Sequence, residues 1–206
     1  MANVSKPTGL KPVGYLNGSP WNGQARMYYV PSTNATALYV GDPVTRLTAS
    51  ADVNGVPSVS IGVAGSAICG VIVGIVVASA GVSLVGSTID LTRRSLPVST
   101  AGYVLVADDP AIIFEVEEGT TASAAGTALT ASAVGNNANF VVIAGTNTYS
   151  DSGTLVDNAT EAVTATLNLK LLGLAQREDN AFGTRAKWLV LINNHQYKGG
   201  TGTLGV

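Results

Sequence analysis

The stretch AGYVLVADDPAIIFEVEE, residues 101–118, decides the fold class of this chain. Both of its halves are rich in β-branched and aromatic residues, and an Asp-Asp-Pro turn at 108–110 separates them. In the second half Ile113, Glu115 and Glu117 share one face of a strand, and the apolar residues Ile112, Phe114 and Val116 share the other. The stretch therefore predicts two strands that pair as a hairpin.

Segments of the same kind recur along the chain, and no segment has the pattern of a long amphipathic helix. A Gly-Asp-Pro turn and an Asn-Gly turn separate the earliest of them. We therefore predict an all-β protein, folded as a small β-barrel or a jelly-roll-like sandwich. Its further strands are expected near 37–47, 67–77, 140–144, 163–172 and 186–193.

The composition divides the chain into three parts. Residues 1–36 are rich in proline, glycine and aromatic residues and contain no acid, which predicts an extended N-terminal arm; an irregular lobe packed on its own core is the alternative. Residues 37–197 form the β domain, with a charge-free, loop-rich insertion at 119–150, and residues 198–206 form a flexible tail. The arm side chains expected to bury area on a neighbouring protein are Trp21, Arg26, Tyr28 and Tyr29.

Charged residues are scarce and segregated. They make up 12% of the chain, against roughly 25% in an ordinary soluble domain, and this scarcity favours a subunit that hides surface against neighbours. Residues 1–94 carry a net charge of +3, residues 95–169 carry −8, and residues 170–206 carry +3. The segments either neutralise one another within the fold or pair between subunits.

The acidic segment contains a second candidate interface, an acidic face made of Asp108, Asp109, Glu115, Glu117 and Glu118. Glu115 and Glu117 point to the same side of a strand, so a glycosidase-like pair or a calcium site is an alternative. No Asp-x-Asp-x-Asp-Gly loop and no aromatic sugar platform adjoin them in the sequence. A strand that faces a partner protein is therefore the preferred interpretation.

The sequence shows no catalytic or cofactor-binding signature. His195 is the single histidine, and no Gly-x-Ser-x-Gly motif supplies a nucleophile for it. Gly200 opens a literal Gly-x-Gly-x-x-Gly match, but no helix follows to hold a pyrophosphate. Cys69, the single cysteine, lies in an apolar run and is expected to be buried. We predict a non-enzymatic protein with no cofactor and no metal.

Membrane and nucleic-acid binding are both disfavoured. Residues 67–86 are apolar, but four glycines and many β-branched residues predict a buried hairpin that turns at 79–81 rather than a spanning helix. The pI is about 5.3 and the bases are scattered, unlike the basic patches of nucleic-acid-binding proteins. The N-terminus lacks a secretory signal pattern, so we expect synthesis in a cytoplasm.

The chain resembles the small virion structural proteins of tailed bacteriophages, over most of its length except residues 119–150. The segments that carry the resemblance are SKPTGLKPVGYLNG (5–18), WNG (21–23), YVGDPV (39–44), YVLVADDP (103–110), FEV (114–116), GLAQREDNAFG (173–183), KWLV (187–190) and NNHQ (193–196).

This resemblance implies a capsid decoration or cement protein, which sits on the outer shell at local two- or three-fold positions and bridges neighbouring capsomers. Its expected partners are the major capsid protein and further copies of itself, as a dimer or trimer. The expected location is the capsid surface of the virion, after synthesis in the host cytoplasm. The alternatives are a tail or adhesin-like virion module and a carbohydrate-active β domain.

Overall fold

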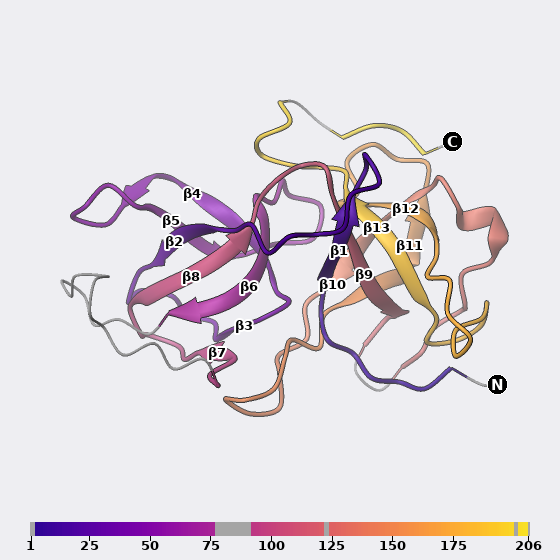
Figure 1. Ribbon diagram of the computed structural model, residues 1–206, viewed down its shortest axis with the longest axis horizontal. Helices are drawn as coiled ribbons and strands as arrows, with labels where there is room; N and C mark the ends of the chain where they lie inside the picture. Colours follow the sequence, from indigo (N-terminus) through magenta and orange to yellow (C-terminus); the bar gives the residue numbers. More distant parts are fainter. Residues whose placement is uncertain (1–2, 77–91, 122–123, 200–201, 206) are drawn as a thin grey trace.

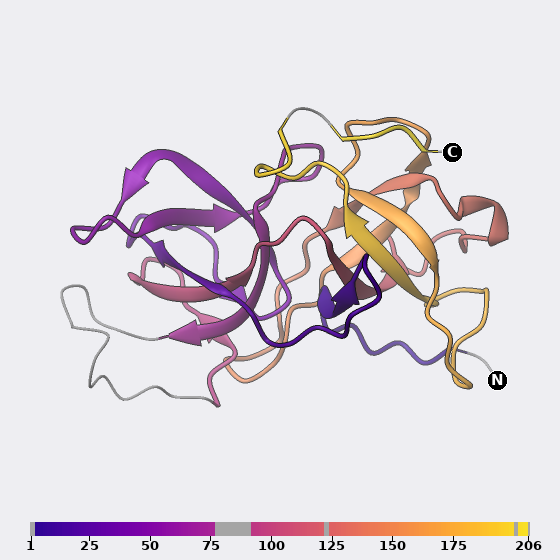
Figure 2. The ribbon, with the colours of Figure 1, turned by 45° about the horizontal axis from the view of Figure 1, so that its top comes forward.

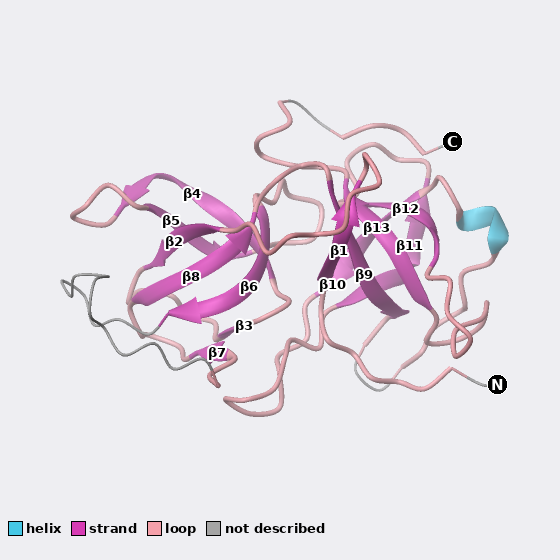
Figure 3. Ribbon diagram, viewed as in Figure 1, coloured by secondary structure: helices cyan, strands magenta, loops and turns pink. Residues whose placement is uncertain are grey.

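The computed structural model describes residues 3–76, 92–121, 124–199 and 202–205, and it confirms the all-β prediction. Figure 3 shows strands throughout these residues, interrupted by one short 3-10 turn, η1 (Ala131–Ala133). Within the described residues, no helix has the length and hydropathy to cross a membrane. The strands are β1 (Lys11–Tyr15), β2 (Arg26–Val30), β3 (Leu38–Tyr39), β4 (Pro43–Ala51), β5 (Pro57–Ile61), β6 (Gly70–Val76), β7 (Ser95–Leu96), β8 (Gly102–Ala107), β9 (Ile112–Gly119), β10 (Asn137–Val141), β11 (Leu155–Ala162), β12 (Leu169–Leu174) and β13 (Lys187–Ile192).

The strands form two lobes that lie side by side along the long axis of the molecule (Figures 1 and 2). In the barrel lobe, β2-β5-β4-β6-β8 close into a barrel, and the short β3–β7 pair lies beside it. In the sheet lobe, six strands pair in the order β1-β9-β11-β10-β12-β13, and an additional β9–β13 pairing turns the sheet back on itself. The β-barrel expectation is therefore met by the barrel lobe, while the second lobe was not predicted.

The hairpin predicted at 101–118 is wrong, although both of its strands form. β8 pairs with β2 and β6 in the barrel lobe, whereas β9 pairs with β1, β11 and β13 in the sheet lobe. The Asp-Asp-Pro segment carries the chain from one lobe to the other. Alternation identified two strands with one buried face each, but it contains no information on which strand each one joins.

The prediction that residues 1–36 form an extended arm is also wrong where β1 and β2 form. β1 is hydrogen-bonded to β9 in the sheet lobe, where Lys11 lies opposite Glu115. β2 is part of the closed barrel, where Tyr28 lies opposite Val104 and is only 1% exposed. The aromatic residues of this region pack on cores of their own chain, which is the alternative that the sequence left open.

The loop-rich insertion at 119–150 is a part of the sheet lobe. β10 lies between β11 and β12, and its Phe140 is 1% exposed within the core. Apart from β10 and a few buried residues such as Leu129 and Ala133, its described residues are half-buried or exposed. The strand expected at 163–172 begins only at Leu169, and the turn expected at 79–81 lies outside the described residues.

The tail expected to be flexible is pinned where the structure describes it. The Asn137 side-chain amide donates to the Thr203 carbonyl at 2.7 Å, and Thr203 N–H donates to the Asn193 side chain at 2.8 Å. Lys170 Nζ donates to the Leu204 carbonyl at 2.6 Å. A Cβ at Gly202 would collide with the Asn193 amide, so close docking explains one glycine of the Gly-x-Gly-x-x-Gly match.

Candidate functional site

The predicted acidic face does not form one exposed surface. Glu118 is 0% exposed and accepts hydrogen bonds from Trp188 Nε1 at 2.8 Å and from Leu129 N–H at 3.2 Å. Burial raises the pKa of this carboxyl to about 7. Because Glu118 lies inside the sheet lobe, it holds the lobe together and is not available to a partner.

Glu117 and Glu115 are each paired with an arginine of the same chain. Glu117, 3% exposed, accepts from Lys6 N–H at 2.8 Å and from Ser5 Oγ at 3.0 Å, and Arg185 lies 3.5 Å away. Glu115 is half-buried, and Arg177 donates to it at 2.9 Å. The two carboxylates lie on the same side of β9, as predicted. Both are already paired within the chain, Glu115 with Arg177 and Glu117 with Arg185 and the Lys6 backbone amide.

Three of the predicted interface residues meet in a cluster where the lobes join. Tyr28 OH donates to Asp108 at 2.6 Å and lies 2.8 Å from Tyr197 OH, and Arg26 lies 3.5 Å from the same carboxylate. Burial raises the pKa of Tyr28, so its hydroxyl remains a donor. Tyr29 packs instead on Tyr103, with ring centroids 5.5 Å apart.

His195 lies beside this cluster, buried and hydrogen-bonded to the backbone of its own chain. It is 1% exposed, and its Nδ1 accepts from Tyr197 N–H at 3.0 Å. Burial lowers the pKa of the imidazole to about 4, so the ring is neutral at pH 7. Ile68 N–H donates to Asn194 O, and Gln196 N–H donates to Ile68 O, which joins the lobes by backbone next to His195.

A second polar cluster at the junction was missed by sequence reasoning. Asp42 is 1% exposed and accepts from Ser152 Oγ at 2.6 Å, Thr154 Oγ1 at 3.2 Å and Tyr39 N–H at 2.8 Å. Burial raises the pKa of Asp42 to about 6. The sequence showed Asp42 only as part of a Gly-Asp-Pro turn, and nothing local links it to serine and threonine side chains more than a hundred positions away.

The ion pairs of the described residues favour charge neutralisation within the fold. Four of them connect the acidic segment to one of the two basic segments: Arg26–Asp108, Arg94–Asp151, Arg177–Glu115 and Arg185–Glu117. Four of the eight acidic residues of that segment therefore have a basic partner inside the same chain.

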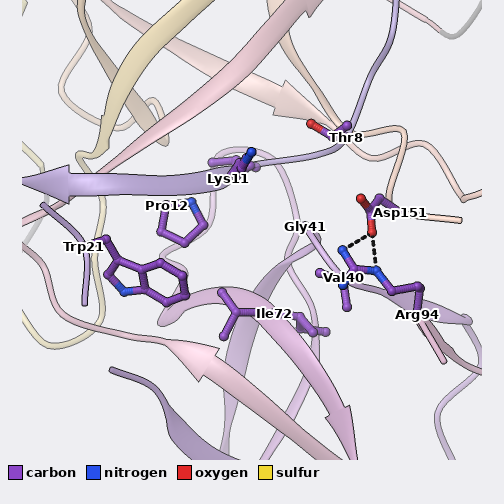
Figure 4. A pocket seen from close by; sticks show the side chains of 11 residues that line it. Thr8, Lys11, Pro12, Trp21, Val40, Gly41, Ile72, Arg94 and Asp151 are labelled. Carbon is purple, nitrogen blue, oxygen red and sulfur yellow. Dashed lines mark hydrogen bonds and ion pairs between the residues drawn. The ribbon is translucent and has the colours of Figure 1, made fainter. Parts of the chain in front are cut away.

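A groove of about 360 Å³ opens between the lobes (Figure 4). Figure 4 shows Trp21 and Pro12 at one end, the Arg94–Asp151 ion pair at the other, and Ile72 between them. The remaining lining residues are Thr8, Leu10, Lys11, Val40, Gly41 and Val73. This groove is where Trp21, one of the predicted interface residues, lies.

Close backbone contact builds the wall of the groove. Leu10 N–H donates to Gly41 O at 3.0 Å, which ties the segment before β1 to the barrel lobe. Gly9 and Gly41 have φ values of +66° and +98°, and a Cβ on Gly9 would lie 2.5 Å from Gly41 O. Only glycine fits this contact, because both the backbone conformation and the space exclude a side chain.

No family model, curated protein or solved structure matches this chain. The described residues also contain no group of three or more histidine, cysteine or acidic side chains arranged to hold a metal ion. The function is therefore inferred from the chain's own residues. The lobe junction with its groove is the candidate site, because it brings together residues that lie far apart in the sequence.

Proposed function

We propose that the chain is a non-enzymatic decoration or cement protein of a tailed bacteriophage, which binds the outer capsid shell and bridges neighbouring major capsid protein subunits. The observation that carries the proposal is the lobe junction, where the Asp42 and Asp108 clusters bury carboxylates between segments far apart in the chain. A bridging protein must resist being pulled apart, and buried, fully paired polar groups oppose separation because opening the junction would leave them unpaired.

The composition of the surface supports the same proposal. Charged residues make up 12% of the chain, and several of them pair with each other or lie buried in the described structure. Interface cores between proteins are depleted in charge relative to other surfaces. Large apolar side chains are also exposed in both lobes, with Val53 92% exposed on the β4–β5 turn and Val163 57% exposed after β11.

The test uses purified capsids that lack the protein. We expect the chain, alone a dimer or trimer by light scattering, to add to these shells until a fixed number of copies per capsomer is reached, and to raise their melting temperature. Chain recovered only with tails would support the tail or adhesin-like alternative and contradict the proposal, as would a failure to bind shells at all.

Bridging has a separate readout, because the strands of the two lobes can be followed separately. Hydrogen exchange of the capsid-bound protein should show new protection in strands of both lobes if both touch the shell or a neighbouring copy. Protection confined to one lobe would contradict bridging through the two-lobed body. Deletion of residues 1–30 is not a suitable test, because it removes β1 and β2 from the two lobes.

A further inference from the structure

The groove between the lobes contains an ion pair of which both partners are reachable from solvent. The side chains of Arg94 and Asp151 are 38% and 29% exposed, whereas the carboxylates of the two polar clusters, Asp42 and Asp108, are almost completely buried. The junction therefore does not close over this ion pair as it closes over those carboxylates. The groove instead leaves a space of about 360 Å³, within the roughly 300–1,000 Å³ of small-molecule sites.

The two ends of the groove have complementary chemistry. Trp21 and Pro12 present flat apolar surfaces, and Ile72 continues this surface between the lobes. At the other end, Arg94 Nε donates to Asp151 Oδ1 at 2.6 Å. A guanidinium supplies several N–H donors in one plane, and a carboxylate supplies acceptors beside them. The lining thus offers an apolar wall, donors and acceptors within one small space.

We infer that this groove binds a sugar ring. A pyranose has C–H groups on one face, which pack on aromatic and proline rings, and hydroxyls around its edge that both donate and accept hydrogen bonds. Trp21 and Pro12 match the C–H face, while Arg94 and Asp151 match adjacent hydroxyls. The inference concerns a ligand site on the isolated protein and goes beyond the capsid-binding function proposed above.

Other ligand classes fit the same lining less well. A fully apolar ligand would remove water from the Arg94–Asp151 pair without replacing its hydrogen bonds, which costs free energy. A cation would lie near Arg94 and Lys11, both in the lining. A neutral, hydroxyl-rich ring satisfies the polar end and still covers the apolar one.

The polar end of the groove is held in place before any ligand arrives. Val40 N–H donates to Arg94 O at 2.9 Å, Arg94 N–H donates to Thr148 O at 3.0 Å, and Ser152 N–H donates to Val40 O at 2.8 Å. These bonds fix the backbone on both sides of the ion pair. A preformed site loses little conformational entropy on binding, which favours measurable affinity for a small ligand.

The two tryptophans of the chain allow a direct test by NMR on the whole protein. Trp21 lines the groove, whereas Trp188 is 0% exposed in the sheet-lobe core and donates to Glu118. The ¹⁵N–¹H indole signals of the uniformly labelled protein are followed while glucose, galactose, mannose and N-acetylglucosamine, and then oligosaccharides of each, are added. We expect a saturable shift of the Trp21 signal with at least one of them and no shift of the Trp188 signal.

Two variants and one control decide the assignment. Trp21→Ala and the nearly isosteric Asp151→Asn should each weaken sugar binding tenfold or more, with the Trp188 signal in place as evidence of folding. Because Trp21→Ala has no Trp21 indole signal, its binding is read from the backbone amide signal of Arg94. Val53→Ala, which shortens a 92% exposed side chain on the β4–β5 turn and outside the groove, should leave binding unchanged. Tighter binding of oligosaccharides than of single sugars would identify a glycan chain as the source of the ring.

The inference is overturned if none of these sugars shifts the Trp21 signal saturably, or if Asp151→Asn binds as well as the unaltered chain. Either result is obtained without capsids and leaves the decoration function to its own test. Conversely, a chain that binds sugars but does not bind capsids would contradict the proposed function and leave the sugar site supported.

Discussion

The barrel lobe and the sheet lobe bury different chemistry. The core of the barrel lobe is aliphatic, with Tyr28 and Cys69 among valine, leucine and isoleucine side chains. The core of the sheet lobe contains Trp188, and the Glu118 carboxylate is buried against it. Aliphatic burial contributes stability that hardly depends on any one partner, whereas a buried polar group depends on each of its hydrogen bonds. The core of the sheet lobe should therefore be more sensitive than the core of the barrel lobe to single substitutions and to pH.

The largest expected effect comes from Trp188→Ala. It removes a completely buried indole and also takes a donor from Glu118, so we expect a loss of about 5 kcal/mol in the free energy of unfolding. The comparison change in the barrel lobe, Leu38→Ala, removes a smaller, equally buried side chain that donates no hydrogen bond, and should cost about 3 kcal/mol. Urea unfolding followed by circular dichroism measures both, and equal losses would contradict the contrast between the lobes.

The two arginines that pair with carboxylates of β9 should differ in how much they contribute to the stability of the sheet lobe. The Arg185 and Glu117 side chains are 11% and 1% exposed, and Arg185→Ala would leave a buried charge with fewer partners, at a cost of about 3 kcal/mol or more. Arg177→Ala removes a more exposed pair, at 39% and 18%, and should cost below about 1 kcal/mol. A larger loss for Arg177→Ala in the same unfolding measurement would reverse this ranking.

The pH dependence should reveal the buried carboxylates. The pKa of Glu118 is raised from 4.5 to about 7, so its contribution to stability is complete below pH 4.5 and is lost as the pH rises through about 7. The pKa of Asp42 is raised from 3.8 to about 6, so the same loss occurs in a lower window. Each shift corresponds to on the order of 3 kcal/mol.

Unfolding free energies between pH 4 and pH 8 test this dependence. Glu118→Gln should flatten the upper part of the decline, and Asp42→Asn should flatten the lower part, because neither amide titrates. If both variants keep the slope of the unaltered chain, the decline has another origin.

A smaller effect than those of the buried carboxylates is expected at the junction between the lobes. Ser152→Ala removes the 2.6 Å hydrogen bond to Asp42 and should cost about 1–2 kcal/mol. Because the bond joins the lobes, the variant should also unfold in two separate steps, with the indole NMR signal of Trp188 reporting the sheet lobe. Ser132→Ala, at an exposed hydroxyl, is the control and should change stability by less than about 0.5 kcal/mol. A single transition in Ser152→Ala would show that other contacts suffice to couple the lobes.

Local sequence patterns are enough to identify the chain as all-β and to place several of its strands. β8, β9 and β13 appear where alternation and β-branched residues place them, and the Gly-Asp-Pro turn separates β3 from β4. The burial of Cys69 also follows from its apolar surroundings. These features are local: a period of two residues and a turn residue can be read within a few positions.

The distribution of the strands between two lobes, and the environments of the acidic residues, depend instead on contacts between distant segments. β8 and β9 are neighbours in the chain but not in any sheet, and β1 and β2 belong to different lobes. Glu118 is interior rather than exposed because its donor, Trp188, comes from a strand 70 positions away. Alternation predicts that a face will be buried, but the surface that buries it, and the donors that make a carboxylate tolerable there, come from distant segments that no local pattern identifies.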